Sequence, residues 1–184
     1  GQSPFAIVLS CADSRVPAEM VFDCGLGDLF VLRVAGNVVG SYILGSIEFA
    51  ATKFNTPLCI VMGHSNCGAI QATLDAVINK RPSPSPMVND LITEISHSAH
   101  DCLASGRHLV SNEKISDQLV QDATVMNVKR SINNIVERSP IIRSLIDDGA
   151  FSLVGANYDI RSGIVTFLDP INSPVSKAED EILK

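Results

Sequence analysis

Apolar residues along this chain fall into two patterns that alternate from one end to the other. Short runs of consecutive apolar, often β-branched residues, such as 5–9 (FAIVL), have the length and composition of buried strands. Longer segments instead place apolar residues at helical spacing, as 41–54 does with Ile43, Ile47 and Ala50 on one face. We expect strands at 5–10, 29–34, 58–62, 151–158 and 164–168. We expect helices at 17–22, 41–54, 66–79, 88–105, 117–139 and 141–147.

Alternating strands and helices predict an α/β fold with a central, mostly parallel sheet flanked by helices. The last two strands are joined only by the short turn Arg161-Ser162-Gly163, which predicts an antiparallel strand at the edge of the sheet. The Pro- and Ser-rich stretch 81–86 is interpreted as a loop and not as a linker between domains. We therefore expect a single domain over residues 1–184.

Composition narrows the possible partners and compartments. The chain is 46% hydrophobic and only 18% charged, with a formal net charge of −6, which argues against nucleic acid or an anionic membrane as partner. No apolar run is long enough to span a membrane, and we expect a signal peptide to be absent or already removed. The five cysteines do not suggest a disulfide framework, so we expect the cytoplasm, with the periplasm or an organelle left open.

Two short segments contain the residues that could bind a metal or take part in catalysis. Cys11-Ala12-Asp13-Ser14-Arg15 follows the first predicted strand, and His64-Ser65-Asn66-Cys67 follows the third. Strands of a parallel sheet end at the same edge, which is where open α/β sheets place their binding sites. Cys sulfur and His nitrogen are preferred zinc ligands, and a catalytic zinc has three protein ligands and one open position. The alternative is that Cys11 and Cys67 are small buried core thiols.

At these residues the sequence resembles the β-class carbonic anhydrases. The resemblance is carried by 11–19 (CADSRVPAE), 27–37 (GDLFVLRVAGN) and 63–69 (GHSNCGA), with weaker similarity at 45–50 and 153–159. It extends from about Phe5 to Leu168 and so covers nearly the whole chain.

This resemblance implies a function and a role for each site residue. Cys11, His64 and Cys67 would hold one Zn²⁺ per chain, and a zinc-bound hydroxide would hydrate CO₂ reversibly to bicarbonate and a proton. Asp13 would orient that hydroxide and Arg15 would keep Asp13 ionised, although an ordinary local ion pair is the alternative.

The resemblance also implies partners and a possible switch. In some members of the family the residue equivalent to Asp13 binds zinc directly in a closed state, so we expect this chain to adopt either state. The N–H of Gly68, at a predicted helix N-terminus, would bind bicarbonate, and we expect replacement of Gly68 to strain the backbone. A homodimer or homotetramer is implied, with helix 41–54 as candidate interface.

Three departures from the family pattern stand out. Cys24 stands at or near a position where many relatives have a Gln that lines the substrate pocket, so the role of Cys24 is open. The chain begins ten residues before Cys11, so we expect the N-terminal helical arm of the relatives to be missing. No Trp is present, so regulation by a second bicarbonate bound to a Trp and an Arg is not expected, although Arg33 stands at the Arg position.

Two other functions are weighed against this one. A related zinc enzyme acting on a CO₂ analogue such as carbonyl sulfide would differ only in its pocket. A structural zinc protein with Asp13 as permanent fourth ligand is less consistent, because it gives Arg15 no role. His97 and His100 form a second candidate metal site, but we expect these side chains to lie on a solvated helix face.

Overall fold

One five-stranded sheet forms the centre of the molecule. The computed structural model describes residues 1–105 and 115–168, and its strands lie in the order β2-β1-β3-β4-β5. The first three pairings are parallel, and β4 and β5 pair antiparallel, as the short turn predicted. The strands are β1 (Ala6–Ser10), β2 (Leu29–Arg33), β3 (Leu58–His64), β4 (Ser152–Asp159) and β5 (Ile164–Phe167).

Six α-helices and one short 3₁₀-helix surround this sheet in the described part of the chain. They are α1 (Ala18–Val21), η1 (Ala35–Asn37), α2 (Ser41–Lys53), α3 (Gly68–Asn79), α4 (Pro86–Ala104), α5 (Asp117–Arg138) and α6 (Pro140–Asp147). Serine hydroxyls cap the N-termini of the last three α-helices by accepting backbone N–H bonds: Ser85 for α4, Ser116 for α5 and Ser139 for α6. No helix among the described residues is long and apolar enough to cross a membrane.

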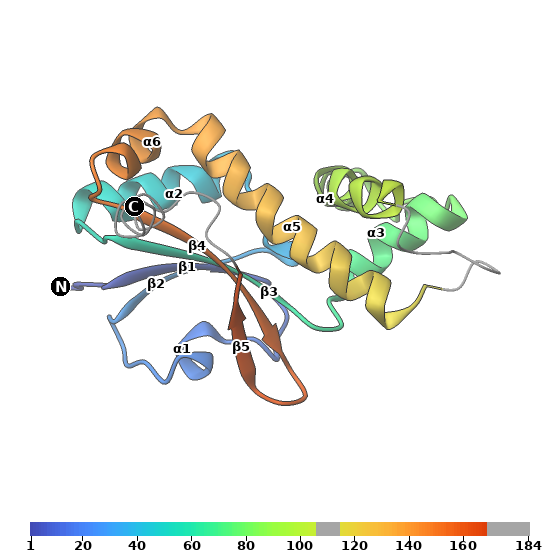
Figure 1. Cartoon of the computed structure of the whole chain (residues 1–184), viewed down its shortest axis with the longest axis horizontal. Helices are drawn as coiled ribbons and strands as arrows, with labels where there is room; N and C mark the ends of the chain where they lie inside the picture. Colours follow the sequence, from blue (N-terminus) through green and yellow to red (C-terminus); the bar gives the residue numbers. More distant parts are fainter. Residues whose placement is uncertain (106–114, 169–184) are drawn as a thin grey trace, which may run out of the picture.

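The helices cover the two faces of the sheet unequally (Figure 1). One face packs against α2, α5 and α6, with side chains such as Ile7, Ile47 and Ile135 in one buried cluster. The opposite face carries the short α1, whose Ala18 packs on Val8. A third cluster joins α3, α4 and the first half of α5 near the carboxyl ends of the parallel strands. The predicted α/β class is confirmed, and both faces of the central strands are buried.

The predicted elements all occur, with two informative differences. The 3₁₀-helix η1 was not predicted, because its buried residues Gly36 and Asn37 have positive φ angles that only tertiary contacts hold in place. The third strand also continues two residues further than predicted. Gly63 and His64 pair with Asn157 and Tyr158 of β4, so a neighbouring strand extends a segment whose own sequence is not β-prone.

The topology brings the two chemically interesting segments together. From β1 the chain passes outward to β2 on one side, and it then returns to form β3 on the other side of β1. Cys11 directly follows β1 and His64 ends β3, so both lie at the carboxyl edge where the strand order reverses. This is the place where open parallel sheets bind their ligands.

Gly63 offers a test of how closely α5 packs on β3. A Cβ atom at Gly63 would lie 2.7 Å from Thr124 Cγ2 and 2.9 Å from Val128 Cγ2, both on α5. We expect Gly63→Ala to lower the free energy of unfolding by about 1–3 kcal/mol through overpacking. Gly45→Ala, where the added Cβ meets nothing within 4 Å inside α2, is the matched control and should raise stability by about 0.5–1 kcal/mol. Urea denaturation measures both, and equal effects would contradict the packing argument.

Candidate metal centre

Three buried side chains converge at the carboxyl edge of the sheet. One ligand atom each from Cys11, His64 and Cys67 lies within 4.8 Å of the others, and the two sulfurs are 4.0 Å apart. These residues are 4%, 0% and 1% exposed. Among the described residues this is the one cluster of metal-ligating side chains, and the sequence predicted all three of its members.

The local backbone explains why His64 and Cys67 are separated by two residues. The strand β3 ends at His64, and Asn66 then takes a left-handed conformation with φ 55°, which Asn tolerates better than most residues. Cys67 is the N-cap of α3. The chain therefore reverses within three residues, and the imidazole from the strand end meets the sulfur from the helix start.

The orientation of His64 suits a metal ligand. Its Nδ1 lies 3.0 Å from the carbonyl oxygen of Ser65, a contact in which the imidazole N–H donates. That hydrogen bond leaves the lone pair on Nε2, and Nε2 is buried without a hydrogen-bond partner. A buried polar atom without a partner is costly, and an electrophile at this point would remove the cost. The residues present therefore fit a zinc ion held by two sulfurs and one nitrogen.

The contact between the two thiols opposes the loss of both protons. The Cys67 thiol next to Cys11 lowers the pKa of Cys11, because it donates a hydrogen bond to the Cys11 thiolate. The same contact, together with burial, raises the pKa of Cys67 well above its usual range. The N–H groups of Ile70 and Ala69 at the start of α3 offset this rise in part. The contact therefore favours ionisation of Cys11 and opposes the further ionisation of Cys67, so the pair holds its second proton more strongly than an isolated thiol does.

Asp13 and Arg15 form a bidentate ion pair beside the cluster. The guanidinium donates from Nε to Oδ1 at 2.9 Å and from Nη2 to Oδ2 at 2.7 Å, and the Arg15 backbone N–H donates to Oδ1 at 3.0 Å. These bonds hold the pKa of Asp13 well below its usual range, with a smaller contribution from His64. Asp13 Oδ2 lies 3.9 Å from His64 Nε2, so an ionised carboxylate borders the metal-ligating atoms.

Arg33 holds the loop that carries Cys11 and Asp13. Its Nε donates to the carbonyl oxygen of Cys11 at 3.0 Å, and its Nη2 donates to the carbonyl oxygen of Asp13. Sequence reasoning considered Arg33 only as an anion-binding residue and missed this structural role. Its position at the end of β2, next to β1, is the signal that indicates it.

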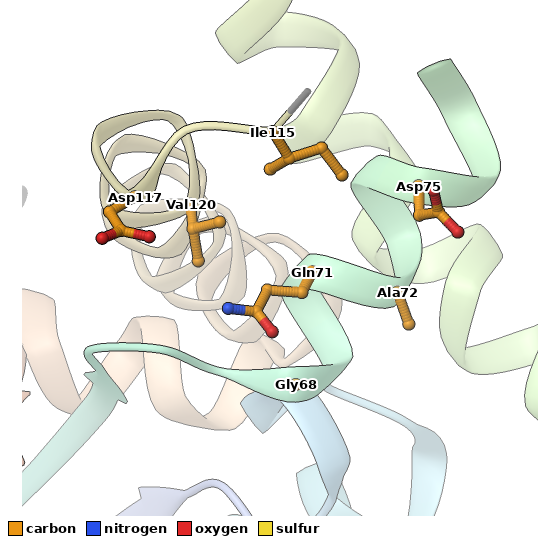
Figure 2. A pocket seen from close by; sticks show the side chains of 7 residues that line it. All are labelled: Gly68, Gln71, Ala72, Asp75, Ile115, Asp117 and Val120. Atoms are coloured by element: carbon orange, nitrogen blue, oxygen red, sulfur yellow. The ribbon is translucent and has the colours of Figure 1, made fainter. Parts of the chain in front are cut away.

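Gly68 begins α3 and lines a cavity of about 410 Å³ between α3 and the start of α5 (Figure 2). The cavity lining includes none of the three metal-ligating residues, and Gly68 is the lining residue that directly follows Cys67 in the sequence. A Cβ atom at Gly68 would meet nothing within 4 Å, and its φ is not left-handed. The expectation that a replacement at Gly68 strains the backbone is therefore wrong.

The remaining sequence candidates lie outside this centre. Cys59 is fully buried, as predicted for a core residue, and burial raises its pKa to about 12. Cys24 is partly exposed and its thiol donates to the carbonyl oxygen of Phe22 at 3.3 Å. His97 and His100 are exposed on α4 and do not belong to a metal-ligating cluster of the described residues.

Zinc uptake should depend on pH because of the proton shared by the two thiols. Binding to two thiolates must displace that proton, so we expect the apparent zinc affinity to rise about tenfold per pH unit near neutrality. Competition with a chromophoric chelator at several pH values measures this affinity. The variant Cys67→Ser removes one of the two thiols, and we expect it to bind zinc more weakly at every pH. An affinity that does not change with pH would contradict the shared proton.

Comparison with known proteins agrees with this centre. The carbonic anhydrase family model matches residues 6–165. The chain is 38% identical over 173 residues to carbonic anhydrase 2 of Mycobacterium tuberculosis, which covers 94% of this chain and 78% of that protein. It is 36% identical over 164 residues to the carbonic anhydrase of Mycolicibacterium smegmatis, covering 89% of this chain and 74% of the relative.

Solved structures give the same result. The β-carbonic anhydrase CcaA superposes with a TM-score of 0.80 at 29% identity, covering 92% of this chain and 79% of that one. The Coccomyxa β-carbonic anhydrase, solved in complex with acetazolamide, superposes with a TM-score of 0.79 at 26% identity and covers 97% and 78%. The chain therefore belongs to the β-carbonic anhydrase family.

Proposed function

We propose that this protein is a zinc-dependent lyase that converts CO₂ and water reversibly into bicarbonate and a proton. The observation that carries the proposal is the convergence of Cys11, His64 and Cys67 beside the Asp13–Arg15 ion pair. Relatives that are 36–38% identical and carry the name carbonic anhydrase support the same reaction.

Cys11, His64 and Cys67 would hold one zinc ion per chain. When bound, zinc acts as a Lewis acid that makes water a nucleophile at neutral pH. Two thiolates neutralise the formal charge of the dication, so neighbouring groups must contribute to the reactivity of that water. The bidentate Asp13 carboxylate is the nearest such group, because its Oδ2 lies 3.9 Å from His64 Nε2.

Asp13 would act as a fixed hydrogen-bond acceptor. Arg15 keeps it ionised, and an ionised carboxylate only accepts hydrogen bonds, so it orients a water or hydroxide with one O–H directed towards Asp13. With its O–H held by Asp13, that oxygen would keep a lone pair available to the carbon of CO₂. Arg33 supports this geometry because it donates hydrogen bonds to the carbonyl oxygens of Cys11 and Asp13, on both sides of Ala12.

The closed state, with Asp13 as a metal ligand, stays a prediction. In the structure Oδ1 accepts two hydrogen bonds from Arg15 and Oδ2 accepts one, so a metal bound by Asp13 would share the carboxylate with this ion pair or displace it. A hydration rate that does not fall towards acidic pH while zinc stays bound would contradict the switch.

Of the alternative functions, neither is favoured. A permanently closed structural site requires an Asp13 oxygen among the metal-ligating atoms, whereas the cluster contains only Cys11, His64 and Cys67 and Asp13 is paired with Arg15. No contact in the described part of the chain favours carbonyl sulfide over CO₂.

We also propose a homodimer or homotetramer in the cytoplasm. The helix α2 exposes large apolar side chains, with Tyr42 94% exposed and Phe49 half exposed, which supports an interface on this helix. Two β-carbonic anhydrases from Sordaria macrospora with the same fold are described as tetrameric. Light scattering on the purified protein distinguishes these assemblies from a monomer. The compartment stays a prediction.

The role of Asp13 predicts a specific kinetic defect. We expect Asp13→Asn to lower kcat for CO₂ hydration by about 10- to 100-fold with zinc content unchanged, because the amide also donates hydrogen bonds and loses its ion pair. Stopped-flow hydration with zinc quantified in the same sample measures this. Asp159→Asn is the matched control, since Asp159 caps the turn before β5 and lies outside the metal cluster. Equal losses in both variants would contradict the assigned role.

The role of Gly68 is tested by a substitution that removes its backbone N–H. Gly68→Pro suits the first position of α3, and the preceding Cys67 has ψ 116°, close to the conformation preferred before proline. We expect this variant to raise KM for bicarbonate dehydration by about 10- to 100-fold, the effect of losing one hydrogen bond to an anion. Gly68→Ala keeps the N–H and should stay near wild type. A Pro variant with unchanged KM would exclude the N–H as bicarbonate donor.

A further inference from the structure

Cys11 receives a hydrogen bond from a loop that the proposed mechanism does not use. The backbone N–H of Gly36 in η1 donates to Cys11 Sγ at 3.4 Å, within the longer range usual for sulfur acceptors. A hydrogen bond to a thiolate withdraws electron density from the sulfur, so the sulfur donates less to a bound metal. The direction of this single N–H therefore affects how strongly Cys11 neutralises the metal.

Glycine by itself does not keep this N–H pointed at the sulfur. Gly36 has φ 70° and ψ 20°, a left-handed conformation that glycine enters and leaves at little cost. Packing confines it in part, because a Cβ here would lie 2.5 Å from Ile95 Cδ1 and 3.3 Å from Ala69 Cβ. Packing against α3 and α4 limits where the loop lies, but a directed hydrogen bond needs a directed anchor.

Asn127 on α5 supplies that anchor. Its Nδ2 donates to the carbonyl oxygen of Gly36 at 2.7 Å, and the side chain is only 2% exposed. Its Oδ1 accepts a hydrogen bond from Ser98 Oγ of α4 at 3.4 Å, which distinguishes the two ends of the amide. A buried amide in the middle of a 22-residue helix is unfavourable unless its polar atoms are used, and here both are used.

We infer that Asn127 is a positioning residue for the metal centre, which holds Gly36 so that its N–H reaches Cys11 Sγ and limits the donation of that thiolate to the metal. Hydrogen bonds connect Ser98 to Asn127, Asn127 to the carbonyl oxygen of Gly36, and the N–H of Gly36 to Cys11. The carbonyl and the N–H of Gly36 belong to the same residue, so the connection is continuous. The inference rests on the proposed zinc site.

Ser131 provides a matched control one helical turn further along α5. Its hydroxyl donates to the carbonyl oxygen of Asn37 at 3.0 Å, so it ties the same loop to the same face of the helix. Ser131 is also buried. Its contact is with Asn37, one residue beyond Gly36, and it is Gly36 whose N–H donates to the sulfur. Loss of either tie weakens the loop, but only loss of the Asn127 tie releases the Gly36 N–H.

The test uses the cobalt-substituted protein, because the energy of the thiolate-to-cobalt charge-transfer band reports how strongly sulfur donates. We expect Asn127→Leu to move this band to lower energy and Ser98→Ala to move it less in the same direction. Ser131→Ala should leave the band unchanged. In the zinc proteins, kcat for CO₂ hydration should fall about 10- to 100-fold in Asn127→Leu but not in Ser131→Ala.

The outcomes separate this inference from the proposed function. An unshifted band in Asn127→Leu, or an equal shift in Ser131→Ala, overturns the positioning role. If Asn127→Leu does not fold, the comparison of Ser98→Ala with Ser131→Ala decides in the same way. If the cobalt bands of the variants shift as expected but the wild-type zinc protein does not hydrate CO₂, the positioning role is supported and the proposed reaction is contradicted. A wild-type protein that binds no metal overturns both.

Discussion

The parallel pairing of β1 with β3 is the constraint on which the rest of the site depends. In its register Ser10 is the partner of Met62, so Cys11 leaves the sheet next to the last residues of β3. Parallel strands end at one edge, and the reversal of strand order between β1 and β3 leaves room there for side chains from both. A shift of this register would separate the sulfur of Cys11 from the imidazole of His64 and remove the metal centre.

Once these residues are brought together, electrostatics determines what the centre can hold. The contact between the two buried thiols opposes the loss of both protons, and His64 presents a buried nitrogen without a hydrogen-bond partner, so a cation would satisfy all three side chains. The nearby carboxylate of Asp13 is paired with the Arg15 guanidinium, which keeps the carboxylate ionised and oriented. The charges are arranged so that one dication satisfies the sulfurs and leaves Asp13 free to accept a hydrogen bond.

The helical layer contributes more than coverage of the sheet. On α5, Asn127, Ser131 and Arg138 donate in turn to the carbonyl oxygens of Gly36, Asn37 and Val39. Their spacing of four and seven residues places them on one face of the helix. A single helix thus holds the strained loop between β2 and α2 that reaches Cys11, and Figure 1 shows α5 crossing the sheet at this point.

Local sequence patterns determined much of this protein. Apolar runs and helical spacing gave every strand and α-helix of the described chain to within a few residues, because burial of apolar surface sets these periods. Residue chemistry and its position after two strands gave Cys11, His64, Cys67, Asp13 and Arg15, since ligand type and sheet-edge location are local properties.

Only the tertiary structure decided the contacts made at a distance in the chain. The η1 loop, the extension of β3 to His64, the clamp of Arg33 and the tie from Asn127 to Gly36 depend on partners 20 or more residues away, the last of them 91 residues apart. The sequence shows Asn127 only as one polar residue in a helix. The role of Asn127 depends on its burial and on the Gly36 carbonyl group that the fold places beside it. The free energy of a buried amide is set by the hydrogen-bond partners around it, and local sequence does not specify these.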